Sequence, residues 1–202
     1  MGIDTRYSVV DCCRISSSRQ LDSVLDLGKQ PLANSLKNDA VNRESLFPLT
    51  LSYCSHSSLL QLNETVDKGI LFDNYVWVTG TSEVARTYAN QFANRVLDIS
   101  GLDSDDLVVE IASNDGTFLK SFVDMSYPNV LGVDPAVNVA EIANKQGVRT
   151  LPEYWTGALA QDLILQYGKA KVVIARNVMP HVSELLDVMT GIELILSKDG
   201  VL

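Results

Sequence analysis

The sequence has few cysteines and no basic clusters, and these shortages disfavour several classes of protein. Only three of its 202 residues are cysteine, an odd number that makes no disulfide framework and is typical of a reducing compartment. Lys and Arg number 16 against 25 Asp and Glu, a formal net charge of -9, which disfavours nonspecific binding to nucleic acid and to anionic membranes. No apolar run reaches about twenty residues, and the first residues lack the basic-then-apolar order of a signal peptide. We therefore expect a cytoplasmic protein that binds neither nucleic acid nor membranes.

The cysteines also lack the spacing of a zinc site. Cys13 and Cys54 each stand where a Cys-x-x-Cys pair would begin, but the positions three residues on are Ser16 and Ser57. Serine is a poor zinc ligand. A set of four ligands could in principle be assembled from Cys12, Cys13, Cys54 and His56. Adjacent cysteines chelate one ion awkwardly, so buried thiols beside a surface histidine are the favoured interpretation.

The stretch from residue 107 to residue 120 is typical of a buried strand, a tight loop and a helix. Residues 107–111 are apolar apart from Glu110, the next five are small or polar and include Gly116, and apolar residues then resume at helical spacing. The start of such a helix leaves backbone N–H groups unpaired. The loop has neither the three-glycine dinucleotide fingerprint nor the Gly-Lys-Ser/Thr of a phosphate loop, and Glu110 and Asp115 would repel a bare polyphosphate. These residues indicate a hydroxyl-rich, cationic or zwitterionic nucleoside cofactor.

Strands and helices alternate after this loop. Residues 130–135 form a second short apolar run that ends in Asp134, about twenty residues past the loop, where an open α/β sheet places its ribose-binding carboxylate. Further strands are predicted near 148–151, over 171–177 with Asn177 at the end, and from 200, with helices over 136–147, 156–167 and 182–196. We predict an α/β fold with a parallel, doubly wound, Rossmann-like sheet. Because Glu110, Asp134 and Asn177 stand at the carboxyl ends of strands, S-adenosylmethionine is the preferred ligand.

The first part of the chain follows another pattern. Residues 1–70 consist of short apolar segments separated by turn-forming residues, so we predict a small irregular N-terminal lobe over residues 1–80 and the Rossmann-like core over residues 81–202. The aromatic-rich stretch over residues 72–82 indicates packing more than a site, on composition alone. Thr81 and Ser82 can cap a helix with a stripe of apolar residues at spacings of three and four. The stripe consists of Ala85, Tyr88, Phe92, Val96 and Ile99.

The chain resembles the sugar C-methyltransferases of deoxysugar biosynthesis in several motifs and in their order along the sequence. The motifs are residues 25–34, the stretch around Tyr75, and residues 110–116, 132–135 and 177–182, which together span nearly the whole chain. The resemblance implies a class I methyltransferase core, an N-terminal zinc-binding lobe, and S-adenosylmethionine as the cofactor. It implies a nucleotide-linked 4-keto-6-deoxy sugar as the substrate, methylated at C-3. A base would remove the C-3 proton, which the ketone acidifies, and the enolate carbon would attack the sulfonium methyl.

The resemblance also suggests roles for individual residues. Asp134 would bind the ribose hydroxyls, and Tyr75 and His181 would transfer the proton or hold the enolate. On the residues alone, His181 is more simply a loop histidine that follows a proline. Tyr154 and Trp155 could wall the adenine or cover the sheet. The expected cofactor-binding residues are Glu110, Ala112, Asn114, Asp115, Gly116, Asp134, Pro135 and Asn177.

The sequence departs from the family pattern at several positions. Ser16 and Ser57 imply that zinc binding is lost or weak, Ala112 replaces the usual glycine of the loop, and Trp77 replaces a tyrosine. The chain ends inside the predicted fifth strand, whereas the family continues with another lobe. We therefore expect the cofactor-binding part of such an enzyme, either a fragment or a chain whose sheet a partner completes. The alternative is a non-catalytic methyltransferase-like module or subunit that keeps the fold without activity. A nicotinamide oxidoreductase is disfavoured by the missing glycine fingerprint.

Overall fold

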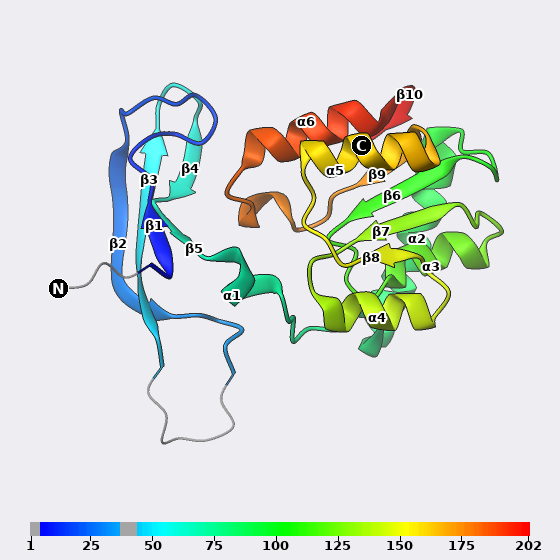
Figure 1. Cartoon of the computed structure of the whole chain (residues 1–202), viewed down its shortest axis with the longest axis horizontal. Coiled ribbons are helices and arrows are strands. Elements are labelled where there is room, and N and C mark those ends of the chain that lie inside the picture. Colours follow the sequence, from blue (N-terminus) through cyan, green and yellow to red (C-terminus); the bar gives the residue numbers. More distant parts are fainter. Residues whose placement is uncertain (1–4, 37–43) are drawn as a thin grey trace. The chain divides into compact units, whose positions relative to one another are not determined.

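The computed structural model describes residues 5–36 and 44–202, which divide into two compact units (Figure 1). The first unit comprises Met1–Asp73 with Ser183–Leu185, and the second comprises Asn74–Val182 with Leu186–Leu202. Residues 74–80, which we expected at the end of the N-terminal lobe, are thus part of the second unit. In neither described range is any helix both long enough and apolar enough to cross a membrane.

The first unit is built from antiparallel strands over a thin core. Its strands are β1 (Tyr7–Val9), β2 (Asp22–Pro31), β3 (Leu46–Cys54), β4 (Leu59–Leu62) and β5 (Glu64–Val66), of which β1 pairs with β5 and the other three form a sheet in the order β2-β3-β4. The short helix α1 (Lys68–Phe72) begins after Asp67, whose carboxylate accepts two of its backbone N–H groups. Among the described residues of this unit, the buried hydrophobic side chains are Cys13, Phe47 and Cys54. So small a core contributes little hydrophobic stabilisation.

The second unit carries a five-stranded parallel sheet in the order β10-β9-β6-β7-β8. Its strands are β6 (Leu107–Ile111), β7 (Val130–Val133), β8 (Thr150–Leu151), β9 (Ala170–Ile174) and β10 (Leu196–Val201). Its helices are α2 (Glu83–Ser100), α3 (Thr117–Asp124), α4 (Val137–Lys145), α5 (Gly157–Tyr167) and α6 (Leu185–Ile195), with 3-10 turns η1 (Thr79–Thr81) and η2 (Met179–His181). The predicted parallel α/β fold is confirmed, and the fifth strand begins at Leu196, ahead of the predicted start at residue 200.

Helices cover both faces of this sheet (Figure 1). Successive side chains of a strand point to opposite faces, so the central strand β6 contributes to two clusters. Val109 and Ile111 pack in one cluster with residues of α5 and α6, and Val108 packs in the other with residues of α2 and α3. Every residue of β6 is buried, including Glu110. By alternation, Glu110 shares the face of Val108, on the side of α2 and α3.

Helix α2 begins where the sequence predicted, because the Ser82 hydroxyl accepts the backbone N–H of Ala85 at 3.3 Å. The predicted buried stripe of α2 is wrong at two residues, because Ile99 is 69% exposed and Tyr88 is 54% exposed. The buried face is rotated toward small residues, which let the helix approach the sheet closely. It consists of Ala89, Ala93, Val96 and Ser100.

Candidate functional site

The loop between β6 and α3 is wound through the left-handed region of backbone space. Ala112 and Asn114 both have φ 54°, and Gly116 has φ 75°. A Cβ atom at Gly116 would lie 2.9 Å from the Val148 Cγ1 and 3.0 Å from the Ala143 Cβ, so only glycine fits there without displacing its neighbours. Ala112 adopts the left-handed conformation despite its methyl group, which costs roughly 1 kcal/mol. The loop therefore keeps its winding without the glycine usual at position 112.

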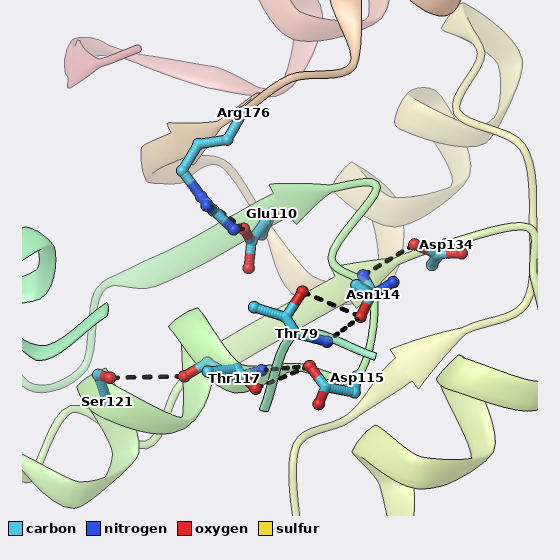
Figure 2. A network of polar contacts seen from close by, with 8 residues as sticks. All are labelled: Thr79, Glu110, Asn114, Asp115, Thr117, Ser121, Asp134 and Arg176. Atoms are coloured by element: carbon cyan, nitrogen blue, oxygen red, sulfur yellow. Dashed lines mark hydrogen bonds and ion pairs between the residues drawn. The ribbon is translucent and has the colours of Figure 1, made fainter. Parts of the chain in front are cut away.

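Asp134, directly after β7, holds this loop from the neighbouring strand (Figure 2). Its Oδ2 accepts the backbone N–H of Asn114 at 2.8 Å, and its Oδ1 accepts the N–H of Ala136 at 2.9 Å. Burial raises the pKa of the Asp134 carboxyl, and these two hydrogen bonds oppose the rise. Each carboxylate oxygen has a second lone pair that can accept a hydroxyl. An acid with acceptor capacity thus adjoins the loop at the carboxyl end of the sheet.

Glu110 is fully buried and paired with Arg176, which follows β9 (Figure 2). Its Oε1 accepts hydrogen bonds from the Arg176 Nη2 at 2.8 Å and Nε at 3.2 Å. The guanidinium also lies over the Phe118 ring, with 3.0 Å between Cζ and the ring centroid, a cation–π contact. Burial raises the pKa of the Glu110 carboxyl to about 7, although Arg176 opposes the rise. Arg176 therefore compensates a charge that would otherwise be very costly to bury.

The second oxygen of Glu110 has no hydrogen-bond partner among the described residues. Within the part of the chain that the structure describes, Glu110 Oε2 is buried and has no hydrogen-bond partner, and the same holds for the Ser113 hydroxyl. Buried polar atoms are nearly always paired, so each exception needs a physical explanation. Both atoms belong to residues at the carboxyl end of β6, where ligands bind in open parallel sheets. An ammonium or hydroxyl group of a ligand would satisfy them.

Asn114 ties the loop to a preceding stretch of chain, residues 74–82, which we call the anchored segment. Its Nδ2 donates to the Trp77 carbonyl at 2.9 Å. Its Oδ1 accepts the backbone N–H of Thr79 at 3.0 Å and the Thr79 hydroxyl at 3.1 Å (Figure 2). Both the nitrogen and the oxygen of the Asn114 side-chain amide are therefore bonded to the anchored segment.

Two further side chains hold the anchored segment. The Asp115 Oδ2 accepts the backbone N–H of Gly80 at 2.8 Å, while its Oδ1 accepts the Thr117 hydroxyl at 2.7 Å at the start of α3. Asn138 of α4 pairs with the backbone of Tyr75 in both directions, accepting its N–H at 3.0 Å and donating to its carbonyl at 2.8 Å. The anchored segment is thus fixed at Tyr75, Trp77, Thr79 and Gly80 by three side chains.

The remaining predicted site residues lie after the ends of strands. Pro135 directly follows Asp134, and Asn177 is exposed after β9 with φ 53°. His181 ends η2 and is exposed. Trp155 belongs to the core between β6, α5 and α6, and its Nε1 donates to the Val188 carbonyl at 3.2 Å. Of the two interpretations open for Trp155, covering the sheet is therefore the correct one.

Arg176 and Asn138 are not among the site residues predicted from the sequence. Arg176 had a signal, because an acid within a buried strand requires a cationic partner and Arg176 ends the apolar run of the predicted neighbouring strand. Asn138 had none, since its partner Tyr75 is 63 positions away in the chain. A paired asparagine in the first turn of a helix looks like any other polar helix residue.

In sequence, the chain is similar to a C-methyltransferase. Residues 13–72 match a protein-family model described as "Putative zinc binding domain". C-methyltransferase NovU of Streptomyces niveus is 31% identical over 193 residues, which make up 95% of this chain and 46% of that protein. The chain therefore spans about half the length of the curated relative that it matches.

Solved structures of methyltransferases align with part of the chain. One is a SAM-dependent methyltransferase from Anabaena variabilis, 19% identical, with 55% of this chain and 48% of that chain covered and a TM-score of 0.44. Another is Streptomyces venezuelae DesVI, 17% identical, with 57% and 48% covered and a TM-score of 0.45. The sequence similarity to a C-methyltransferase confirms, over nearly the whole chain, the resemblance predicted from its motifs.

Proposed function

We propose that this chain binds S-adenosylmethionine and forms the cofactor-binding part of a methyltransferase that acts on C-3 of a nucleotide-linked 4-keto-deoxysugar. One observation carries the proposal. Two buried acids, Glu110 and Asp134, stand at the carboxyl ends of adjacent parallel strands, beside the loop whose backbone is left-handed at Ala112, Asn114 and Gly116. Among the described residues, Glu110 Oε2 has no hydrogen-bond partner. The carbon acceptor is supported by the C-methyltransferase relative, and the sugar by the motif resemblance.

The polar groups of the site fit this cofactor. S-adenosylmethionine carries an ammonium group, a sulfonium and two ribose hydroxyls, so it presents donors and positive charge where a polyphosphate presents negative charge. Glu110 Oε2 suits the ammonium or a hydroxyl, and Asp134 suits the ribose hydroxyls. Ala112 and Gly116 contribute backbone to the same loop, and Pro135 and Asn177 follow the neighbouring strands β7 and β9. We assign Asn114 and Asp115 to shaping this cofactor loop, since their side chains bond to the anchored segment.

The cofactor, when bound, supplies an electrophilic methyl group. On the substrate, a ketone at C-4 lowers the pKa of the C-3 proton, so a protein base can remove it and leave an enolate whose carbon is the nucleophile. Tyr75 and His181 are our candidates for taking this proton or for holding the enolate oxygen. The two hydrogen bonds between the Asn138 amide and the Tyr75 backbone, one in each direction, support a fixed position for Tyr75.

Calorimetric titration of the chain with S-adenosylmethionine tests the cofactor proposal. We expect micromolar-range affinity that Asp134→Ala weakens by on the order of 2 kcal/mol, the size of a lost pair of hydrogen bonds. Asp162→Ala, an exposed aspartate on α5, is the matched control and should leave the affinity unchanged. A folded chain that binds no cofactor would refute the proposal and favour the non-catalytic module.

Isotope exchange tests the catalytic candidates without requiring methyl transfer. A nucleotide-linked 4-keto-6-deoxy sugar, incubated with the protein in D2O, should exchange its C-3 proton at a rate followed by NMR. Loss of the proton-accepting group should slow this exchange by about 10²-fold or more. Tyr75→Phe and His181→Asn would be compared with His56→Asn, which changes an exposed histidine of the first unit. If neither candidate variant slows the exchange, both assignments fail.

A further inference from the structure

The first unit contains a cluster of two thiols and two hydroxyls. Cys13 and Ser16 come from the turn after β1, and Cys54 and Ser57 come from the end of β3 and the turn before β4. The Cys13 Sγ lies 3.1 Å from the Ser57 Oγ, and the Cys54 Sγ lies 3.5 Å from the Ser16 Oγ. Each thiol thus hydrogen-bonds to the serine of the other segment. The two cysteines are also two of the few buried apolar residues of this unit.

The backbone is already folded around one of these sulfurs. The Cys13 Sγ accepts the backbone N–H groups of Ile15 at 3.5 Å and of Ser16 at 3.4 Å. The Cys13 carbonyl accepts the N–H of Ser17 at 2.9 Å, and its own N–H donates to the Ser18 carbonyl at 2.8 Å. The turn that presents Cys13 and Ser16 is therefore held by hydrogen bonds within the chain.

The donor set does not fit the zinc ion that the matched family description implies. Structural zinc sites are closed by four thiolate, imidazole or carboxylate ligands, whereas this cluster offers two thiols and two neutral hydroxyls. The Nδ1 of His56 lies 3.0 Å from the Ser18 Oγ and is hydrogen-bonded there. Over residues 5–36 and 44–202, no group of three or more His, Cys, Asp or Glu side chains is placed to hold a metal ion.

We infer that the cluster of Cys13, Ser16, Cys54 and Ser57 holds these two segments of the first unit together without a metal ion. Two serine hydroxyls stand in the places of two zinc-binding thiols. The same four positions would then become a zinc site when both serines are replaced by cysteine. The pairing of Cys13 with Ser57 and of Cys54 with Ser16 brings together the two segments that a zinc ion would join. Hydrogen bonds between hydroxyls and thiols are individually weak, so this closure is less stable than a metal site.

Metal analysis and melting of the full chain test the first half of the inference. The purified chain should contain far less than one zinc per chain by elemental analysis, even after incubation with excess zinc and desalting. Its thermal unfolding should not change when a chelator is added. Zinc retained at about one per chain, or a chelator that lowers the melting temperature, would overturn the inference.

Restoring the thiols tests the second half. The double variant Ser16→Cys with Ser57→Cys should bind one Co²⁺ or Zn²⁺ per chain, show the visible absorption of tetrahedral cobalt thiolate, and melt at a temperature that the chelator lowers. The matched control is Ser17→Cys with Ser55→Cys, which adds two thiols to the same two segments at exposed positions. The inference fails if the control binds Co²⁺ as tightly as the double variant, or if a folded double variant binds none. Should the double variant not fold, the metal content and melting of the unchanged chain still decide.

Discussion

Glu110 places a titratable carboxylate in the centre of the sheet, where its pKa rises from 4.5 to about 7. Between these two values the folded chain binds a proton that the unfolded chain releases. The stabilisation from this proton is complete below about pH 4.5 and is lost as the pH rises through about 7. Glu110 therefore makes the folded chain less stable at neutral pH than in mild acid.

Urea unfolding at pH 5 and at pH 7 measures this effect. As the pH rises from 5 to 7, loss of the Glu110 proton should lower the free energy of unfolding by about 2 kcal/mol. Glu110→Gln should remove that difference, because glutamine does not titrate. Glu153→Gln, at an exposed position, should keep the pH dependence of the unchanged chain. If the free energy of unfolding changes equally between pH 5 and pH 7 in the unchanged chain and in the Glu110 variant, burial does not raise the pKa of Glu110.

Ala112 is the residue at which the loop is strained. Because its φ is 54°, Ala112→Gly should relieve the clash of the methyl group and raise the free energy of unfolding by about 1 kcal/mol. Ala136→Gly is the control, since Ala136 has φ -76° and its replacement should destabilise the chain by roughly 0.5–1 kcal/mol. Denaturant midpoints of both variants give the comparison. If the Ala112→Gly variant is less stable than the unchanged chain, the backbone of Ala112 is not strained.

Single residues were predictable where a spacing rule applies to them. Open α/β sheets place ligand-binding residues at the carboxyl ends of their strands. This rule points to Glu110, and the spacing from the loop points to Asp134. The partners of Asn114 and Asp115 do not follow from any such rule, because their hydrogen bonds reach back to Thr79 and Gly80. An amide or carboxylate in a loop offers the same atoms to a ligand and to a distant backbone, so sequence alone cannot choose between them.

At the scale of elements, the anchored segment shows how side chains replace regular pairing. Apart from the one-turn η1, residues 74–82 belong to no helix or strand, yet their backbone groups bond to Asn114, Asp115 and Asn138. Such a segment depends on a few contacts, so removing one side chain should loosen it locally.

Asn138→Ala removes both hydrogen bonds to the Tyr75 backbone. We expect the Tyr75 amide to exchange with solvent at least about tenfold faster, since a lost pair of hydrogen bonds costs about 1–2 kcal/mol. Hydrogen exchange followed by mass spectrometry or NMR would detect the change over residues 74–78. Glu141→Ala alters an exposed residue of the same helix and should leave that exchange unchanged. Unaltered protection in the Asn138 variant would mean that other contacts hold Tyr75.

The elements of the second unit were predictable because each strand and helix carries its own hydrophobic period. The first unit was harder, since β2 is exposed along its whole length and has no alternation to recognise. The existence of β2 depends on its partner β3, and the register between these strands shifts twice. The face of α2 was mispredicted because alanine at 89 and 93 marks close approach to the sheet, while hydrophobicity points to Tyr88 and Ile99.

For the molecule as a whole, the two units have very unequal cores. Both large apolar clusters of the described residues lie in the second unit, whereas the first buries few apolar side chains. We therefore expect two calorimetric transitions, with the first unit melting at the lower temperature. Phe47→Ala should lower or abolish the first transition and spare the second, and Phe122→Ala should do the reverse. A single transition that both substitutions move would show that the units unfold together.

The anchored segment also decides where this chain can be recombined with its relatives. Residues 74–82 follow the first unit along the chain, but their partners Asn114, Asp115 and Asn138 are all in the second. A chimera that joins the first unit of one homologue to the second unit of another should therefore cross over at Asp73. A junction placed after Ser82 would set a foreign segment against the three side chains that bond to the native one. The second unit thus begins at Asn74, upstream of α2, the first long helix that marks it in the sequence.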